Sequence, residues 1–215
     1  GGKNASLGEM IRTLKKKRIR VPSGFATTAL AYRQFLDRNK LTEKIKERLE
    51  VYHAEKQTLE KTGQSIRRLI RRSSFGEDLE NDITQAYQRL SAQYSVDEVD
   101  VAVRSSATSE DLPEASFAGQ QETFLNITGV DDLLDACRKC YASLFTDRAI
   151  SYRREKGFDH MKVALSVGVQ KMVRSDKSGS GVMFSIDTET GFPHVAIINA
   201  AWGLGENVVQ GKITP

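Results

Sequence analysis

The sequence predicts an α+β protein, and three features carry that prediction. Residues 41–94 show helical periodicity and no strand signal, whereas the second half holds several strand-like segments. These segments alternate with single helices and turns, as is typical of antiparallel sheets with packed helices. The composition, with 215 residues of which 39% are apolar and 28% charged, is that of a globular chain long enough for one large domain or two small ones.

The N-terminal part is predicted to begin with an amphipathic helix. We expect Asn4 to cap this helix and residues 15–18 to end it. Residues 19–26 then predict a short strand and turn, and Thr27 or Thr28 is expected to cap a second helix. The apolar residues of the two helices recur at helical spacing: Leu7, Met10, Ile11 and Leu14, then Tyr32, Phe35 and Leu36.

The remaining elements follow from the same reading of periodicity. Residues 41–95 are predicted to form a helical insert or small bundle. Two further helices are expected, a polar one at residues 147–156 and, before it, one that carries Leu133, Leu134, Cys137, Tyr141 and Leu144. The expected strands are residues 99–103, 122–127, 163–173, 181–185 and 195–201.

A polar segment at residues 104–121 is the most informative stretch. It is longer than the ~12–15 residues above which loops without secondary structure are usually functional. Arg104 can fork onto phosphate oxygens, and the small hydroxyl residues let backbone N–H groups approach an anion. A polar surface hairpin with an incidental arginine is the alternative. The hydroxyl residues are Ser105, Ser106, Thr108 and Ser109.

The first three residues, Gly1, Gly2 and Lys3, form a second candidate anion site. Glycine allows a close backbone approach, and the N-terminus of the following helix presents free N–H groups and a positive dipole. Lys3 would add a mobile charge. A chain end beside a capped helix has the same appearance, so this pattern by itself leaves both interpretations open.

Two glycine patterns near the C-terminus do not meet the requirements of known nucleotide motifs. Between Gly205 and Gly211 lie five residues, where a P-loop needs four, and Ile213 stands where a serine or threonine should bind magnesium. Val208 occupies the third glycine position of a dinucleotide fingerprint. Any nucleotide must therefore be bound by another architecture.

The cysteines and histidines give no sign of a metal site. Cys137 and Cys140 form a lone C-x-x-C on an apolar helical stripe, which favours a structural role over zinc or redox chemistry. His53, His160 and His194 share no motif, and we expect them to be surface or hydrogen-bonded histidines. Two cysteines and no apolar run near ~20 residues favour a reducing, cytoplasmic setting without a membrane span.

The net charge of +4 is mild, although basic residues cluster at 15–20 and 67–72. A basic nucleic-acid-binding module is therefore an alternative from another functional class. No aromatic residue is interleaved for base stacking, and acidic residues are close by. A solvated face is the preferred interpretation of both clusters, and no nucleic-acid partner is expected.

Six segments together resemble the N-terminal ATP-binding domain of the phosphoenolpyruvate synthase family. In order, they are GGKNASLGEM at 1–10, VPSGFATT at 21–28, VRSSATSEDLPEASFAGQQETF at 103–124, DRAISYR at 147–153, VQKMV at 169–173 and WGLGE at 202–206. The resemblance covers essentially the whole chain. Pyruvate phosphate dikinases and rifampicin phosphotransferases share this domain, and a rifampicin phosphotransferase is the alternative enzyme.

The resemblance implies an ATP-grasp fold over residues 1–215, incomplete on its C-terminal side and interrupted by the helical insert at 41–95. Both chain ends look cut, so a fragment of a longer protein is expected. The implied roles are neutralisation of the ATP phosphates by Lys3 and Arg104, a phosphate loop, an adenine contact and a ribose contact. The phosphate loop would include Gly119 and Thr123, the adenine contact Gln170 and Met172, and the ribose contact Glu206.

For the whole enzyme, the resemblance implies that ATP, pyruvate and water give AMP, phosphoenolpyruvate and phosphate. The phosphoryl group would pass through a phosphohistidine on a swivelling domain, and none of the three histidines lies in such a motif. Mg²⁺ is expected, with its ligands beyond residue 215. The implied partners are ATP, pyruvate, the swivelling domain and a second copy of the chain, and this part alone is not expected to complete turnover.

Overall fold

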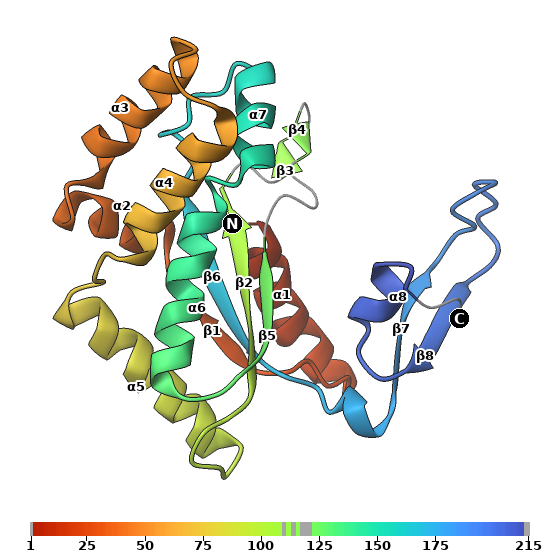
Figure 1. Ribbon diagram of the computed structural model, residues 1–215. Helices are drawn as coiled ribbons and strands as arrows, with labels where there is room; N and C mark the ends of the chain where they lie inside the picture. The colour runs from red at the N-terminus through yellow and green to blue at the C-terminus, as the bar shows by residue number, and fades with distance from the viewer. Residues whose placement is uncertain (1, 109–110, 113–114, 117–121, 213–215) are drawn as a thin grey trace. The chain divides into compact units, whose positions relative to one another are not determined.

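The computed structural model describes residues 2–108, 111–112, 115–116 and 122–212, and it has the predicted α+β architecture (Figure 1). The chain divides into two compact units, residues 1–172 and residues 173–215. The first unit contains a four-stranded antiparallel sheet and seven α-helices, counted over the described residues. The second contains a two-stranded antiparallel sheet and one short helix.

The sheet of the first unit has the strand order β1-β6-β2-β5. The central pair, β2 and β6, is in register along seven residue pairs, from Val101 opposite Lys171 to Ala107 opposite Leu165. A two-stranded hairpin of β3 and β4 follows β2. The strands are β1 (Gly24–Ala26), β2 (Val101–Ala107), β3 (Asp111–Leu112), β4 (Ala115–Ser116), β5 (Thr123–Ile127) and β6 (Leu165–Lys171).

Helices cover this sheet from both sides, with α1 and α6 on opposite sides (Figure 1). The predicted cap of α2 is confirmed, because the Thr28 hydroxyl accepts a hydrogen bond from the Ala31 N–H at 3.1 Å. The helices are α1 (Gly2–Leu14), α2 (Ala29–Arg38), α3 (Leu41–His53), α4 (Leu59–Arg71), α5 (Glu77–Gln93), α6 (Val130–Ser143) and α7 (Asp147–Glu155).

The main core lies between one face of the sheet and helices α2 to α6. Alternate residues of the central strands, such as Val103, Leu165 and Val167, are fully buried there. Aromatic side chains pack against one another beside α2, where the ring centroids of Tyr32 and Tyr141 are 5.0 Å apart. Residues 41–94 contain helices and no strand, as their periodicity predicts.

The second unit follows Met172 directly. Its elements are a 3₁₀ turn (Ser175–Lys177), β7 (Gly179–Phe184), β8 (Ile197–Trp202) and α8 (Glu206–Val209). Both strands confirm sequence predictions, whereas the short helix α8 lies in a glycine-containing segment for which no helix is predicted. Several large apolar side chains of this unit are more than half exposed: Met183, Phe192, Ile198, Trp202 and Val209.

Two local predictions are wrong, and a third is confirmed. Helix α1 begins at Gly2, so Asn4 lies inside it and does not cap it. Strand β2 continues through Ser105 and Ser106 to Ala107, because these residues pair with β6, and the polar segment thus begins later than predicted. The predicted end of the first helix at residues 15–18 is confirmed, because α1 stops at Leu14 and a 3₁₀ turn at residues 15–17 leads to Arg18, whose backbone is left-handed.

Candidate nucleotide site

The face of the sheet opposite the main core is polar. Directly paired residues of neighbouring strands share a face, so Arg104 lies beside Gly168 of β6 and Thr123 of β5. We name this set of side chains the polar sheet face, and it consists of Arg104, Ser106, Thr123, Ser166, Gly168 and Gln170. It unites three predicted site residues, Arg104, Thr123 and Gln170, from three different strands.

Arg104 is held in place by Gln170. The arginine Nη2 donates a hydrogen bond to Gln170 Oε1 at 2.6 Å, and Gln170 Nε2 donates to the carbonyl of Pro22 at 3.0 Å. Both side chains are half-buried. Because the neutral amide leaves the guanidinium charge uncompensated, Arg104 remains suited to an anion.

The first turn of α1 reaches this face through Asn4. Its Nδ2 donates to Ser166 Oγ at 2.6 Å, and its Oδ1 lies so close to Gly168 that a Cβ there would meet it at 2.4 Å. Glycine at 168 therefore lets the helix approach the strand. Lys3, the neighbour of Asn4, is exposed in the same first turn. The tertiary fold thus brings the N-terminal end of α1 to the strand pair that carries Arg104.

Ser106 lies two residues beyond Arg104 on the same face. Its side chain is 1% exposed, and its hydroxyl has no hydrogen-bond partner among the described residues. Ser105 faces the other way, and its N–H and hydroxyl both contact the Glu122 carbonyl. Thr108 likewise bonds the Ala164 carbonyl through its N–H and its hydroxyl. The predicted anion-facing role of these two residues is wrong, because the sheet uses their polar groups; Ser109 lies outside the described residues.

Met172 ends the first unit, and Val173 begins the second. The Met172 N–H donates to the Asp100 carbonyl at 2.9 Å, and its own carbonyl accepts from Lys171 Nζ at 2.9 Å. Lys171 is also paired with Asp100 at 2.5 Å. The main-chain groups of Met172 are therefore already used, and the side chain, 9% exposed, is what remains for a ligand.

The last two predicted site residues lie elsewhere. Glu206 is exposed at the start of α8 in the second unit, where its Oε1 accepts a hydrogen bond from Gln210 Nε2 at 2.6 Å. Gly119 lies outside the described residues. No sequence pattern marks Asn4, Ser166 or Gly168 as site residues. Only the strand register places Ser166 and Gly168 on the face of Arg104, and only the packing of α1 brings Asn4 to them.

The cysteines occupy the apolar side of the sheet. Cys137 and Cys140 on α6 are 1% and 0% exposed, and burial raises the pKa of Cys137 to about 12 and that of Cys140 well above its ordinary value. Buried thiols of this kind are inert, as the apolar stripe predicts. Among the residues that the structure describes, no group of three or more His, Cys, Asp or Glu could hold a metal ion.

His160 is a hydrogen-bonded histidine, as predicted. Its Nδ1 accepts from Arg153 Nε at 2.9 Å, while the buried Arg153 also donates to the Leu144 carbonyl. Burial, followed by the charge of Arg153, lowers the pKa of His160 to about 4. The centroid of the His53 ring lies 5.8 Å from that of His160, although the two residues are more than a hundred positions apart and share no motif.

Comparison with known proteins decides the family. The family model described as "Pyruvate phosphate dikinase, AMP/ATP-binding domain" matches residues 1–215. The chain belongs to this family. The resemblance of the sequence to a dikinase-type ATP-binding domain is thereby confirmed.

The relatives that resemble this ATP-binding domain include several phosphoenolpyruvate synthases. The chain is 57% identical to that of Aquifex aeolicus over 216 residues, 59% to that of Helicobacter pylori and 56% to that of Escherichia coli. Each match covers 100% of this chain but only 25% to 27% of the relative. The chain therefore spans about a quarter of the length of these curated relatives. None of its described helices combines the length and apolar character that a membrane span requires.

Proposed function

We propose that the chain is the ATP-binding part of a phosphoenolpyruvate synthase and that the polar sheet face binds the ATP phosphates. The observation that carries the proposal is Arg104, a guanidinium without a carboxylate partner among the described residues, fixed by Gln170 beside the first turn of α1. Membership of an AMP/ATP-binding family supports it. No specific observation favours the rifampicin phosphotransferase alternative.

The residues of this face fit a polyphosphate. Arg104 supplies a planar guanidinium, Thr123 is an exposed hydroxyl directly beside it, and Gly168 lets the first turn of α1 approach the strand. When bound, ATP supplies the phosphoryl group. Lys3 and Arg104 then position and neutralise its phosphates, which is the main protein contribution to phosphoryl transfer. Gly119 completes the phosphate loop in this proposal.

The base and ribose are assigned to the end of β6 and to the second unit. Gln170 and Met172 lie where the chain leaves the first unit, and we assign the adenine to their side. The apolar Met172 side chain suits a purine ring, since its main-chain groups are occupied. Glu206, whose carboxylate already accepts a hydrogen bond from an amide, is assigned to the ribose hydroxyls.

We further propose an ATP-grasp fold, which is built from two α+β subdomains. The division of the chain at residues 172 and 173 supports it. So does the sheet of the second unit, where Met183 and Ile198 are directly paired and both about two-thirds exposed. Further strands of the same domain would cover this apolar face and supply the Mg²⁺ ligands. In this proposal, residues 1–215 are the incomplete domain and residues 41–95 its helical insert.

The complete enzyme would work in the cytoplasm and convert pyruvate, ATP and water to phosphoenolpyruvate, AMP and phosphate. A swivelling domain with a phosphohistidine would carry the phosphoryl group between sites, and a homodimer is the proposed assembly. The printed names of the relatives support the synthase assignment.

Titration of the full-length protein with a non-hydrolysable ATP analogue tests the proposal. We expect saturable binding that weakens at least about tenfold in Arg104→Ala, because a charge-assisted hydrogen-bond donor is lost. Arg89→Gln on α5 removes one exposed arginine elsewhere and should bind as the wild type does. Oligonucleotide binding that falls steeply with salt, without analogue binding, would instead support the nucleic-acid alternative and refute the proposal.

A second titration tests the assignment in the second unit. Glu206→Gln is expected to weaken analogue binding without changing the affinity for pyruvate, since the carboxylate would accept hydrogen bonds from the ribose. Glu189→Gln removes one exposed carboxylate of the same unit and serves as the control. Equal analogue affinity in the two variants would contradict the ribose assignment.

A further inference from the structure

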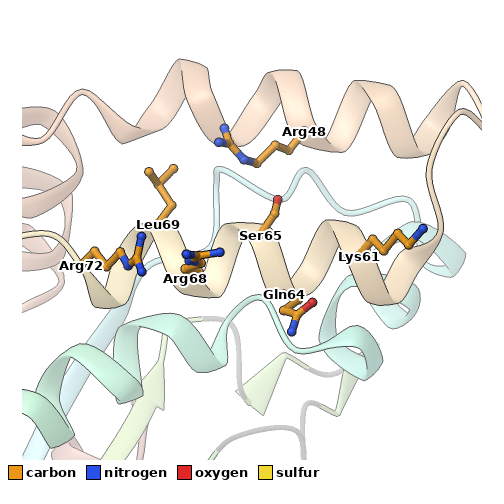
Figure 2. A pocket seen from close by; sticks show the side chains of 7 residues that line it. All are labelled: Arg48, Lys61, Gln64, Ser65, Arg68, Leu69 and Arg72. Atoms are coloured by element: carbon orange, nitrogen blue, oxygen red, sulfur yellow. The ribbon is translucent and has the colours of Figure 1, made fainter.

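A basic hollow lies between α3 and α4, on helices that carry none of the predicted site residues (Figure 2). Its volume is about 430 Å³. In Figure 2, the Arg48 side chain lies along α3 on the side that faces α4, while Arg68 belongs to the last turn of α4 and Arg72 directly follows that helix. We call it the α3–α4 basic pocket, and its lining consists of Arg48, Lys61, Gln64, Ser65, Arg68, Leu69 and Arg72.

Positive charge in this pocket is not balanced locally. Four of the seven lining residues are cationic, and none is acidic. A second hollow of about 420 Å³ shares Arg68 and Arg72 and adds Arg71 and Asp135, whose carboxylate is already paired with Lys139 at 2.7 Å. None of these three arginines forms an ion pair with a described residue. Like charges four residues apart on a helix repel each other, so an anion would relieve this repulsion.

A neighbouring arginine shows what a structural role looks like. Arg67 donates to Asp147 Oδ1 at 2.7 Å and to the Phe145 carbonyl at 2.8 Å, and so ties α4 to the start of α7. The predicted solvated face is therefore wrong for Arg67. Arg68 and Arg72 make no such contacts and remain exposed, which leaves their guanidinium groups open to a ligand.

The walls of the pocket are rigid elements. Ile66 and Ile70 anchor α4 in the main core, and Ile45 anchors α3 there; all three residues are 0% exposed. Arg48 is oriented by its own helix, because its Nη1 donates to the Lys44 carbonyl at 2.7 Å. A site built on packed helices holds its charged groups at a defined spacing.

We propose that the α3–α4 basic pocket binds a small anion that carries two or more phosphate groups. Arg68 and Arg72 are four residues apart, a spacing that puts their Cβ atoms roughly 5–6 Å from each other, and each guanidinium can match one phosphate. Arg48 and Lys61 add charge along the same groove. The lining contains no aromatic side chain, so it offers no surface for stacking a base and selects the phosphates. The pocket shares no residue with the polar sheet face and is independent of the proposed function.

Calorimetric titration of the full-length protein with inorganic pyrophosphate tests this site. The wild type is expected to bind saturably, more tightly than it binds orthophosphate, and Arg68→Gln/Arg72→Gln should bind at least about tenfold more weakly. Arg68→Lys/Arg72→Lys keeps the charge but loses the forks and should lie between the two. Arg20→Gln/Arg89→Gln, which removes two exposed arginines elsewhere, should bind as the wild type does.

Controls separate this pocket from the proposed ATP site. Thermal unfolding checks that each variant is folded, which the exposure of Arg68 and Arg72 leads us to expect. Pyrophosphate binding that persists in Arg104→Ala supports a separate pocket, whereas its loss there refutes it. The proposal is also overturned if the Arg68/Arg72 variant binds normally, if the control pair weakens binding equally, or if only oligonucleotides or acidic peptides bind the wild type.

Discussion

The two faces of the four-stranded sheet come from alternate residues of the same strands, yet they have opposite properties. One face carries Val103, Leu165 and Val167, all fully buried against helices. The other carries Arg104, Gln170 and Gly168 beneath the first turn of α1, in which no residue is fully buried. The difference indicates a division of labour: the apolar face stabilises the fold, and the polar face is available for binding. A variant on the apolar face should therefore change stability and leave ligand affinity nearly unchanged, and a variant on the polar face should do the reverse.

The largest effect is expected for Arg104→Ala on the polar face. In the full-length enzyme, phosphoryl transfer should fall on the order of 10³-fold, equivalent to about 4 kcal/mol, if this guanidinium stabilises transition-state charge. Pyruvate-dependent AMP formation measures the rate, and urea unfolding should show little change. Activity within a few-fold of the wild type would reject the catalytic role of Arg104.

The next effect is expected for Leu165→Ala on the apolar face. Leu165 is 0% exposed, so its truncation should lower the free energy of unfolding by about 2–5 kcal/mol, measured by urea titration. The affinity of the folded variant for an ATP analogue should remain that of the wild type. Leu165→Met, which nearly conserves volume, should cost less than about 1.5 kcal/mol. Loss of nucleotide affinity without loss of stability would break the division between the faces.

A smaller effect is expected for Thr28→Ala, which removes the cap of a helix covering the apolar face. The Ala31 N–H would lose its side-chain acceptor, and stability should fall by about 1 kcal/mol. Thr28→Ser keeps the acceptor and is the control, expected to retain most of the stability. Thermal or urea unfolding distinguishes them, and equal losses in both would show that the methyl group matters and the cap does not.

The smallest effects are expected for two serines paired across the polar face. Ser106→Ala removes a buried hydroxyl without a partner among the described residues, so stability should stay within about 0.5 kcal/mol or rise. Ser166→Ala removes the acceptor of the Asn4 amide and should cost about 0.5–1.5 kcal/mol. If Ser106→Ala instead weakens binding of the ATP analogue, this hydroxyl belongs to the site.

Elements with a strong local signal were predictable from the sequence. The helix that begins after Thr28, the helices between residues 41 and 94, and strands β7 and β8 all lie where periodicity and capping place them. Their hydrophobic spacing is a local property of the chain, so no tertiary information is needed to recognise it. The start of the polar segment after Val103 was not predictable in this way, because pairing with β6 extends the strand through residues whose composition favours a loop.

The sequence by itself determined the family, the α+β class and the residue types available for phosphate. It could not determine which of these residues share a face, because sheet register depends on pairing between separate strands, which for β2 and β6 lie more than fifty residues apart in the sequence. Only the tertiary structure places Arg104 beside Thr123, Gly168 and Gln170, and only helix packing joins Arg48 with Arg68. Local spacing specifies an element, whereas a binding surface arises from the long-range contacts that assemble several elements.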